Sequence, residues 1–385
     1  MAERLAPLFA DVPNRFSLTL DAWVSHAGIF SATITFKEAL AVSWYNASGI
    51  PIPIGTFQLE PLHVHSKRAY INQTVTFNIT DEDNFSLFTA SMITSENFTW
   101  HMASDKLDVR ALAFPTAHNL HFNKDVTLKG MNNFDNAVTL VDFQLPADAP
   151  DGAGIEFVAT TGLSNPSAFD VNLGTVVFDL SYQGVFLGRG SGPNTTIVPG
   201  ANNVTLAGTL VPQSGAANLS TVSALFTQYL NAESSDVVAT GVSSVQDDGA
   251  AVSWLSAGLA ALALHVPFKA PSAIAPIKAI DIGDLALAFS AGSPWAPVAN
   301  SRSVQASLEL PFGFGLSIGE IQNAFNISTS MGVVAGLSTV RFRELSCWDD
   351  GVLTCGCAWA ARGRIDERDR SRQLDVHARD HQHHH

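Results

Sequence analysis

Apolar and polar residues alternate along most of the chain between residues 20 and 340. In 176–182, apolar and aromatic side chains take every second position, with Asp and Ser between them. The same period recurs in 169–173, 74–80 and 304–310. A period of two with one apolar face is typical of β-strands that pack on a single core. The pattern therefore predicts an all-β fold.

Clusters of Gly, Pro and Asn predict the turns between these strands. Residues 188–194 (GRGSGPN) and 198–203 (VPGANN) have this composition, and we interpret both as turns. The run IPIPI contains Pro51 and Pro53. Because proline has no N–H to donate to a ladder, this run is expected at the edge of a sheet.

One helix is predicted from apolar spacing near residue 225. Its apolar stripe follows the i, i+3, i+4, i+7, i+8 spacing of a helix packed on a core, and consists of Val222, Leu225, Phe226, Tyr229 and Leu230. Ser220 is placed as the N-cap. This pattern fits a sandwich module that carries one short helix.

The most apolar stretch, residues 254–268, is interrupted by Ser256, Gly258, His265 and Pro267. It is too short to cross a bilayer, so we interpret it as a core helix that runs into a strand. The first sixteen residues also lack the continuous apolar segment of a secretory signal.

The sequence repeats internally. Residues 75–80 followed by 84–93 resemble 204–209 followed by 218–226, and each pair reads as a strand, a polar turn and a helix. Residues 112–130 also resemble 264–284. Tandem units of this kind are more typical of scaffolds than of enzymes.

We therefore expect tandem immunoglobulin-like β-sandwich modules, each with a short helix. The expected boundaries are a lead-in at 1–19, a first module at 20–135, a second module at 136–292, a partial third module at 293–340 and an irregular tail at 341–385.

Composition narrows the classes of function. The net charge of -14 argues against a nucleic-acid partner, because phosphate neutralisation needs clustered Lys and Arg. From Arg341 the alternation ends, and all three cysteines (Cys347, Cys355 and Cys357) lie beyond it. We interpret this tail as an artefact of the gene model, with a native disordered tail as the alternative. Because cysteines are confined to the tail, disulfides report nothing about the compartment.

The Asn-x-Ser/Thr sequons are more informative about the compartment. Chance alone would give roughly four at average Ser and Thr usage. The chain has nine, at Asn46, Asn72, Asn78, Asn84, Asn97, Asn194, Asn203, Asn218 and Asn326. Asn165 is excluded because Pro166 follows it. Glycosylation of several sites is expected, which indicates the lumenal side of a secretory-type membrane. An anchor outside this sequence would reconcile the sequons with the missing signal.

No motif supports catalysis. Gly315-x-Ser317-x-Gly319 matches a nucleophile elbow, but the alternation around it places the serine in the middle of a strand rather than at a strand–helix turn. The three glycines of 188–192 match part of a dinucleotide fingerprint, which must open a helix. The segment that follows them reads as strand and turn.

Metal binding is also not expected. His63 with His65, and His118 with His121, form two pairs with no carboxylate or cysteine at ligand spacing, so surface histidines are the better interpretation. The acidic run 81–83 is expected to favour the positive end of the helix at 84–93 rather than to bind calcium. We expect no catalytic residues, no metal and no cofactor.

Residues 159–200 resemble a fungal family that carries the uncharacterised domain DUF3712 and is similar to the LEA type 2 β-sandwich. The resemblance rests on Asn165-Pro166, on the paired alternating strands that follow, and on 253–271, 277–289 and 310–318. It implies a membrane-anchored protein of the fungal vacuole, with lumenal sandwiches linked to the control of autophagy. The anchor and later repeats of that family would lie outside this chain. The resemblance brings no catalytic residues.

Two hypotheses follow, with a β-sandwich hydrolase as a distant third that lacks a visible Asp/Glu pair. The first is a non-enzymatic interaction or regulatory module that meets lumenal protein partners. The second is lipid binding in the second module, with the helix at 220–230 as a lid. Its inward-facing wall would be Phe169, Val171, Val176, Phe178, Leu180, Val204 and Leu206. Because β-branched and aromatic side chains interdigitate well, we expect a filled core there.

Overall fold

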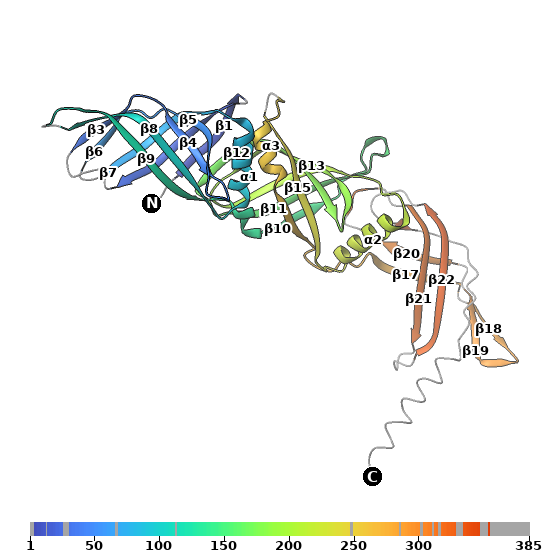
Figure 1. Cartoon of the computed structure of the whole chain (residues 1–385). Coiled ribbons are helices and arrows are strands. Elements are labelled where there is room, and N and C mark those ends of the chain that lie inside the picture. Colours follow the sequence, from blue (N-terminus) through green and yellow to red (C-terminus); the bar gives the residue numbers. More distant parts are fainter. Residues whose placement is uncertain are drawn as a thin grey trace, which may run out of the picture. The chain divides into compact units, whose positions relative to one another are not determined.

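The computed structural model in Figure 1 is mostly β, as the alternation predicts. It describes residues 4–12, 14–25, 31–65, 68–111, 114–246, 249–284, 286–300, 303–309, 312–314, 317–328, 334–346 and 353–354. Its contacts divide the chain into two compact units, Met1–Ala273 and Ile274–His385. The first unit contains the expected first module and most of the second.

A twisted antiparallel sheet forms the N-terminal part of the first unit, and we call it the first sheet. Two of its inner positions are each filled by two short strands in succession, so that β5 and β6 both pair with β7, while β4 and β3 both pair with β8. Its strands are β2 (Arg15–Ser25), β3 (Ala32–Phe36), β4 (Leu40–Tyr45), β5 (Pro51–Phe57), β6 (Leu62–His65), β7 (Arg68–Ile79), β8 (Asn97–Ala111) and β9 (Ala117–Lys129).

The alternation in β7 is confirmed, because Val75, Phe77 and Ile79 are buried while the residues between them are exposed. The prediction for Pro51 and Pro53 is correct for only part of β5. The proline end pairs with β4 alone, whereas residues 55–57 also pair with β7, so the strand as a whole is not an edge. Pro51 and Pro53 therefore lie in the part of β5 that does not pair with β7, where the ladder to β7 needs no N–H from them.

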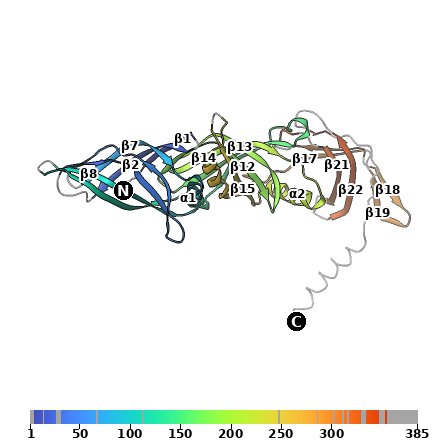
Figure 2. The ribbon, with the colours of Figure 1, turned by 45° about the horizontal axis from the view of Figure 1, so that its top comes forward.

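The C-terminal part of the first unit is a second antiparallel sheet of seven strands, which we call the second sheet (Figure 2). Its order is β10 (Thr139–Gln144), β11 (Ile155–Asn165), β14 (Gly200–Leu210), β13 (Val185–Ile197), β12 (Phe169–Tyr182), β15 (Ser235–Val245) and β16 (Ala263–Phe268). β1 (Arg4–Val12) pairs with both β2 and β12, and so joins the two sheets.

β12 contains two alternating runs. The buried apolar residues take odd-numbered positions in the first run and even-numbered positions in the second. Phe169, Val171 and Leu173 are buried, and after Gly174 the buried positions shift to Val176 and beyond. Gly174 has φ of 62° and lies between two register shifts. An extra residue of this kind turns both runs to the same face, which keeps one continuous apolar wall.

The interpretation of 188–194 as a turn is wrong, because these residues lie inside β13. Their glycines allow a close approach instead. A Cβ at Gly190 would lie 2.8 Å from Phe157 Cζ, and one at Gly192 would lie 2.9 Å from the Thr205 carbonyl oxygen. Glycine in a strand often marks such a close approach. The turn predicted from 198–203 is present in part, since β13 ends at Ile197 and β14 begins at Gly200.

Three α-helices occur among the described residues: α1 (Glu82–Thr94), α2 (Ala216–Leu230) and α3 (Ser253–Ala260). Two short 3-10 segments accompany them, η1 (Asn132–Asn136) and η2 (Pro150–Gly152). α1 follows β7 and α2 follows β14, which matches the repeat of strand, turn and helix. α3 leads into β16, as expected for 254–268.

The two repeat helices begin differently. Asp81 caps α1 by accepting a hydrogen bond of 2.9 Å from the Asn84 backbone N–H, and Glu82 and Asp83 fill the first turn as expected. The N-cap predicted at Ser220 is wrong, because α2 begins four residues earlier and has Gly215 at its cap. The residues before Ser220, 216–219, form an exposed first turn of the helix.

The second unit contains three small groups of paired strands. They are β17 (Ile277–Gly283) with β20 (Ser303–Leu308) and β23 (Leu353–Thr354), β18 (Ala286–Ser290) with β19 (Ser293–Asn300), and β21 (Ser317–Ser328) with β22 (Val334–Ser346). Ser317 is the first residue of β21 rather than a mid-strand residue. β22 continues past Arg341, where the irregular tail was expected to begin. The three cysteines lie outside the described residues.

The core of the first sheet is filled by aromatic rings. Phe16 stacks on Phe77 at 4.8 Å, and Phe85 of α1 meets Trp254 of α3 edge-on at 5.0 Å. All four rings are at most 2% exposed. Offset and edge-to-face pairs of this kind stabilise a core beyond the area that they bury. α1 and α3 therefore pack between the two sheets around one aromatic cluster (Figure 1).

Candidate functional site

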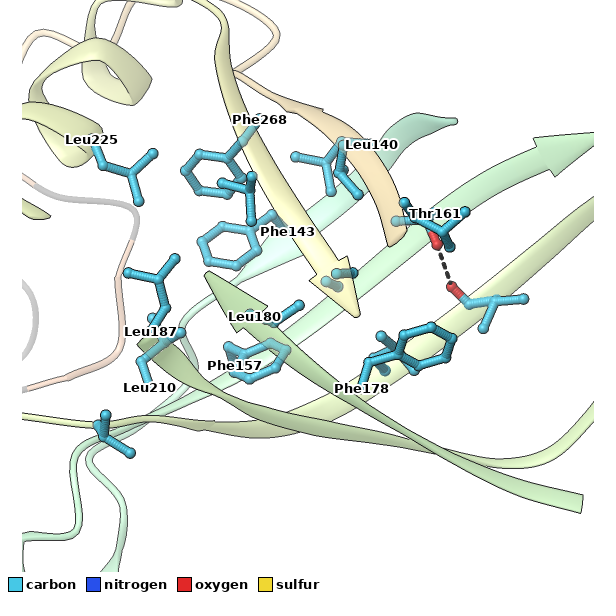
Figure 3. Close-up of a pocket in the computed structure, with 18 of the residues that line it drawn as sticks. Leu140, Phe143, Phe157, Thr161, Phe178, Leu180, Leu187, Leu210, Leu225 and Phe268 are labelled. Carbon is cyan, nitrogen blue, oxygen red and sulfur yellow. Dashed lines mark hydrogen bonds between the residues drawn. The ribbon is translucent and has the colours of Figure 1, made fainter. Parts of the chain in front are cut away.

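The second sheet encloses a cavity of about 470 Å³. All seven strands contribute to its wall, and α2 lies over it with Leu219, Val222, Leu225 and Phe226 (Figure 3). Protein interiors leave few voids larger than a water molecule. A volume of this size lies instead in the range of small-molecule binding sites.

The wall is almost entirely apolar. Among the described residues that line it, none is ionisable, and the polar side chains are Thr161, Thr195 and Gln213. The Thr161 hydroxyl donates to the Val204 carbonyl at 3.3 Å, and the Thr195 hydroxyl donates to the Gly192 carbonyl at 2.8 Å. Both hydroxyls are satisfied by the wall itself. The interior therefore suits hydrocarbon rather than a charged group.

The two ends of the second sheet meet without a ladder. In the pairings of the described strands, β10 joins only β11 and β16 joins only β15. Phe143 of β10 and Phe268 of β16 close this seam with an edge-on contact at 4.8 Å. Both rings line the cavity, and Figure 3 shows them next to each other. A seam held by side chains alone opens more easily than a hydrogen-bonded ladder.

The C-terminal half of α2 is fixed to the seam and the wall. Tyr229 stacks on Phe268 at 4.6 Å and meets Phe143 at 5.7 Å. The Gln228 side-chain carbonyl accepts hydrogen bonds from the Tyr182 hydroxyl at 3.2 Å and from the Ser235 hydroxyl. Burial raises the pKa of Tyr229 above its ordinary value, with a further contribution from nearby Asp142.

The N-terminal half of α2 is much less buried. Leu219 lines the cavity and is still 53% exposed, and the buried residues of the helix are Leu225 and Tyr229. Pro212 and Gln213 continue this rim, and Gln213 donates to the Phe186 carbonyl at 2.8 Å. The helix is therefore anchored at one end and open at the other, which is the arrangement of a lid.

Five of the seven predicted wall residues line the cavity: Val176, Phe178, Leu180, Val204 and Leu206. Phe169 packs on Phe98 of the first sheet at 5.6 Å instead. Val171 lines a separate void of only about 10 Å³ beside α1. The expectation of a filled core is wrong, because medium-sized side chains on a strongly curled sheet do not reach its centre.

Sequence reasoning missed the wall contributed by β10, β15 and β16. Phe143, Val237, Ala239 and Phe268 lie on these strands. The sequence predicted a strand at the end of 254–268, where β16 lies, but the period of two was not used to predict β10 or β15. It did not report that the first and last strands of the sheet come together, since that depends on how far the sheet curls.

The paired histidines do not line the cavity, and they do not converge on one site. His63 hydrogen-bonds to Thr33, whereas His121 pairs with Asp105 at 3.0 Å. His118 lies 3.0 Å from Asp108, and its hydrogen bond lowers the pKa of that carboxyl. In the part of the chain that the structure describes, no three His, Cys, Asp or Glu side chains come together as metal ligands.

The sequons lie mainly on exposed positions. Asn72, Asn78, Asn97, Asn194, Asn203 and Asn218 are exposed, Asn46 and Asn84 are partly exposed, and the side chain of Asn326 lies outside the described residues. The excluded Asn165 is buried at 1% exposure, where its amide donates to the Phe169 carbonyl at 3.0 Å. It shapes the turn before β12.

Comparisons with known proteins give one family. No curated protein matches the chain. Among the described residues, no helix has the length and apolar character needed to span a membrane. Residues 52–180, from β5 through α1 to β12, match the family model described as a protein of unknown function, DUF3712.

Proposed function

We propose that the second sheet binds the hydrocarbon part of a lipid beneath α2. The observation that carries this proposal is the cavity of about 470 Å³, whose described lining has no ionisable side chain. An empty apolar space of this size costs stability that a filled core would keep. A bound hydrocarbon chain would restore the missing contacts.

The volume fits one acyl chain. At roughly 30 Å³ for each small group, as for water in the liquid, the cavity of about 470 Å³ holds about fifteen methylenes. A charged head group would remain at the rim, because burying an unpaired charge is very costly. The chain would therefore lie with its tail inward, and binding would depend on tail length more than on the head group.

The expected affinity is micromolar or weaker. Burial contributes about 0.8 kcal/mol per methylene, or about 12 kcal/mol for fifteen of them. Lost translational and rotational freedom costs at least about 4 kcal/mol. At most about 8 kcal/mol then remains, which corresponds to a dissociation constant of about 1 μM or weaker.

Native mass spectrometry of the full chain tests this proposal, with hexadecanol and palmitoyl lysophosphatidylcholine as probes. Both should bind at one site, and Ala239→Phe should abolish binding by filling the cavity. Thr240→Phe is the matched control, because Thr240 is the next residue of β15 and is absent from the cavity wall. Equal lipid uptake by the Ala239→Phe variant, or no uptake by the unmodified chain, would exclude the proposal.

We also propose that the chain works on the lumenal side of a secretory-type membrane, as a non-enzymatic module. The nine sequons support this location, as does the resemblance to LEA-like, vacuolar, membrane-anchored fungal proteins linked to autophagy. Lumenal protein partners would then accompany or replace lipid. Endoglycosidase treatment of the chain secreted from yeast behind a supplied signal should remove several kilodaltons. Unchanged mobility on a gel would remove the main argument for the lumenal location.

A further inference from the structure

An exposed aromatic pair lies on the outer face of the first sheet. Trp23 of β2 and Tyr70 of β7 are opposite each other in the ladder, with ring centroids 4.8 Å apart. They are 48% and 45% exposed. Single exposed apolar residues are common on protein surfaces. Two large rings in contact on an otherwise polar face of β7 form a platform.

A sequon lies directly beside this platform. Asn72 is two residues from Tyr70 on β7, so both side chains point to the same face. Asp21 is the ladder partner of Asn72. Hydrogen bonding to Asp21 is the main cause that raises the pKa of the Tyr70 hydroxyl, and hydrogen bonding to Asn72 opposes this rise.

We propose that Asn72 is a glycosylation site whose first sugar packs on the rings of Trp23 and Tyr70. The sugar comes from a lipid-linked oligosaccharide pyrophosphate. Its C1 forms a bond to Asn72 Nδ2 while the C1–oxygen bond to the pyrophosphate breaks. The displaced amide proton leaves with the acidic pyrophosphate. This proposal rests on the proposed lumenal location and is independent of lipid binding in the second sheet.

The chemistry of the contact favours a sugar. One face of an N-acetylglucosamine ring presents C–H groups, which pack on the electron-rich face of an aromatic ring. The hydroxyl and amide groups of the sugar remain free for water and for Asp21. Covering two half-exposed rings removes apolar area from water and leaves the polar side of the sugar outside.

The chain provides a matched control sequon on the same strand and face. Asn78 is also exposed, but its partner on β2 is Arg15, and its neighbours two residues away on β7 and β2 are Thr76 and Ser17. A glycan at Asn78 would therefore have no aromatic platform. Any effect of glycosylation that is general to the surface should appear equally at both sites.

The test uses the full chain secreted from yeast, with glycopeptide mass spectrometry and thermal unfolding. We expect a glycan on Asn72. Asn72→Gln should lower Tm by about 2 °C, as expected for about 1 kcal/mol in a domain of this size, whereas Asn78→Gln should leave it unchanged. An endoglycosidase that leaves the first sugar in place should not lower Tm, because that sugar makes the contact.

Trp23→Ala separates the sugar contact from a simple effect of the strand. It should lower Tm more in the glycosylated chain than in the Asn72→Gln background, where no sugar rests on the ring. An unoccupied Asn72 would overturn the proposal. Equal shifts for the Asn72→Gln and Asn78→Gln variants, or purely additive effects of Trp23→Ala and Asn72→Gln, would also overturn it.

Discussion

The two sheets of the first unit use the same unit of strand, turn and helix for opposite purposes. In the first sheet, α1 buries Phe85, Phe88 and three further residues in an aromatic cluster. In the second sheet, α2 buries only Leu225 and Tyr229 and lies over a cavity of about 470 Å³. One helix completes a core and the other covers a hollow one.

The difference lies in side-chain volume rather than in polarity. The first core contains Phe and Trp rings that meet at its centre, whereas Leu and Val dominate the wall of the second. Both patterns read as apolar in a sequence. An interior stays empty when its side chains are too short to meet and the backbone cannot collapse further.

The largest expected effect is a difference in stability between a truncated side chain of α1 and one of α2. Phe85→Ala should destabilise the chain by about 3–5 kcal/mol, since it opens a new cavity in a filled core. Leu225→Ala should cost about 1–2 kcal/mol, because Leu225 already faces empty space and has fewer contacts to lose. Urea unfolding of both variants measures the difference. Equal losses would mean that the second core is filled in solution.

Adding side-chain volume should also destabilise the first sheet more than the second. Val42 of the first sheet and Val176 of the second are both at most 1% exposed, but only Val176 lines the cavity. Val42→Phe should cost about 1–3 kcal/mol through overpacking, whereas Val176→Phe should be close to neutral and should weaken lipid binding. Urea unfolding measures the stability of both variants. A comparable destabilisation by both substitutions would contradict a hollow second core.

A smaller effect is expected at the start of α1. Asp81→Ala should destabilise the chain by about 1 kcal/mol, because the Asn84 backbone N–H loses its acceptor. Asp81→Asn retains an acceptor at the same position and serves as the control. Thermal unfolding compares the two variants. The N-cap of α2 is Gly215, which makes no side-chain hydrogen bond, so α2 has no equivalent interaction to remove.

The smallest effect concerns pH and the aromatic seam. The pKa of Tyr229 is raised because its burial favours the neutral hydroxyl. This contribution to stability is fully present below the ordinary value of 10.0 and is lost as pH rises through the higher folded value. The stability difference between the chain and its Tyr229→Phe variant should change only above about pH 10. A change near neutral pH, measured by urea unfolding, would contradict this cause.

The sequence by itself determined the local structure. The period of two marked the strands, as in β7 and β12, and the spacing of Leu225 and Tyr229 marked the body of α2. The acidic run at 81–83 marked the start of α1. These features depend on neighbours within a few residues, so they are legible without the fold.

Only the tertiary structure decided which apolar faces met and which did not. The glycines at 188–192 have the composition of a turn, yet they lie in a strand because Phe157 and β14 approach them closely. The seam between Phe143 and Phe268 joins residues far apart in sequence. The cavity follows from the curl of seven strands and the reach of their side chains, and both are properties of packing that no local pattern records.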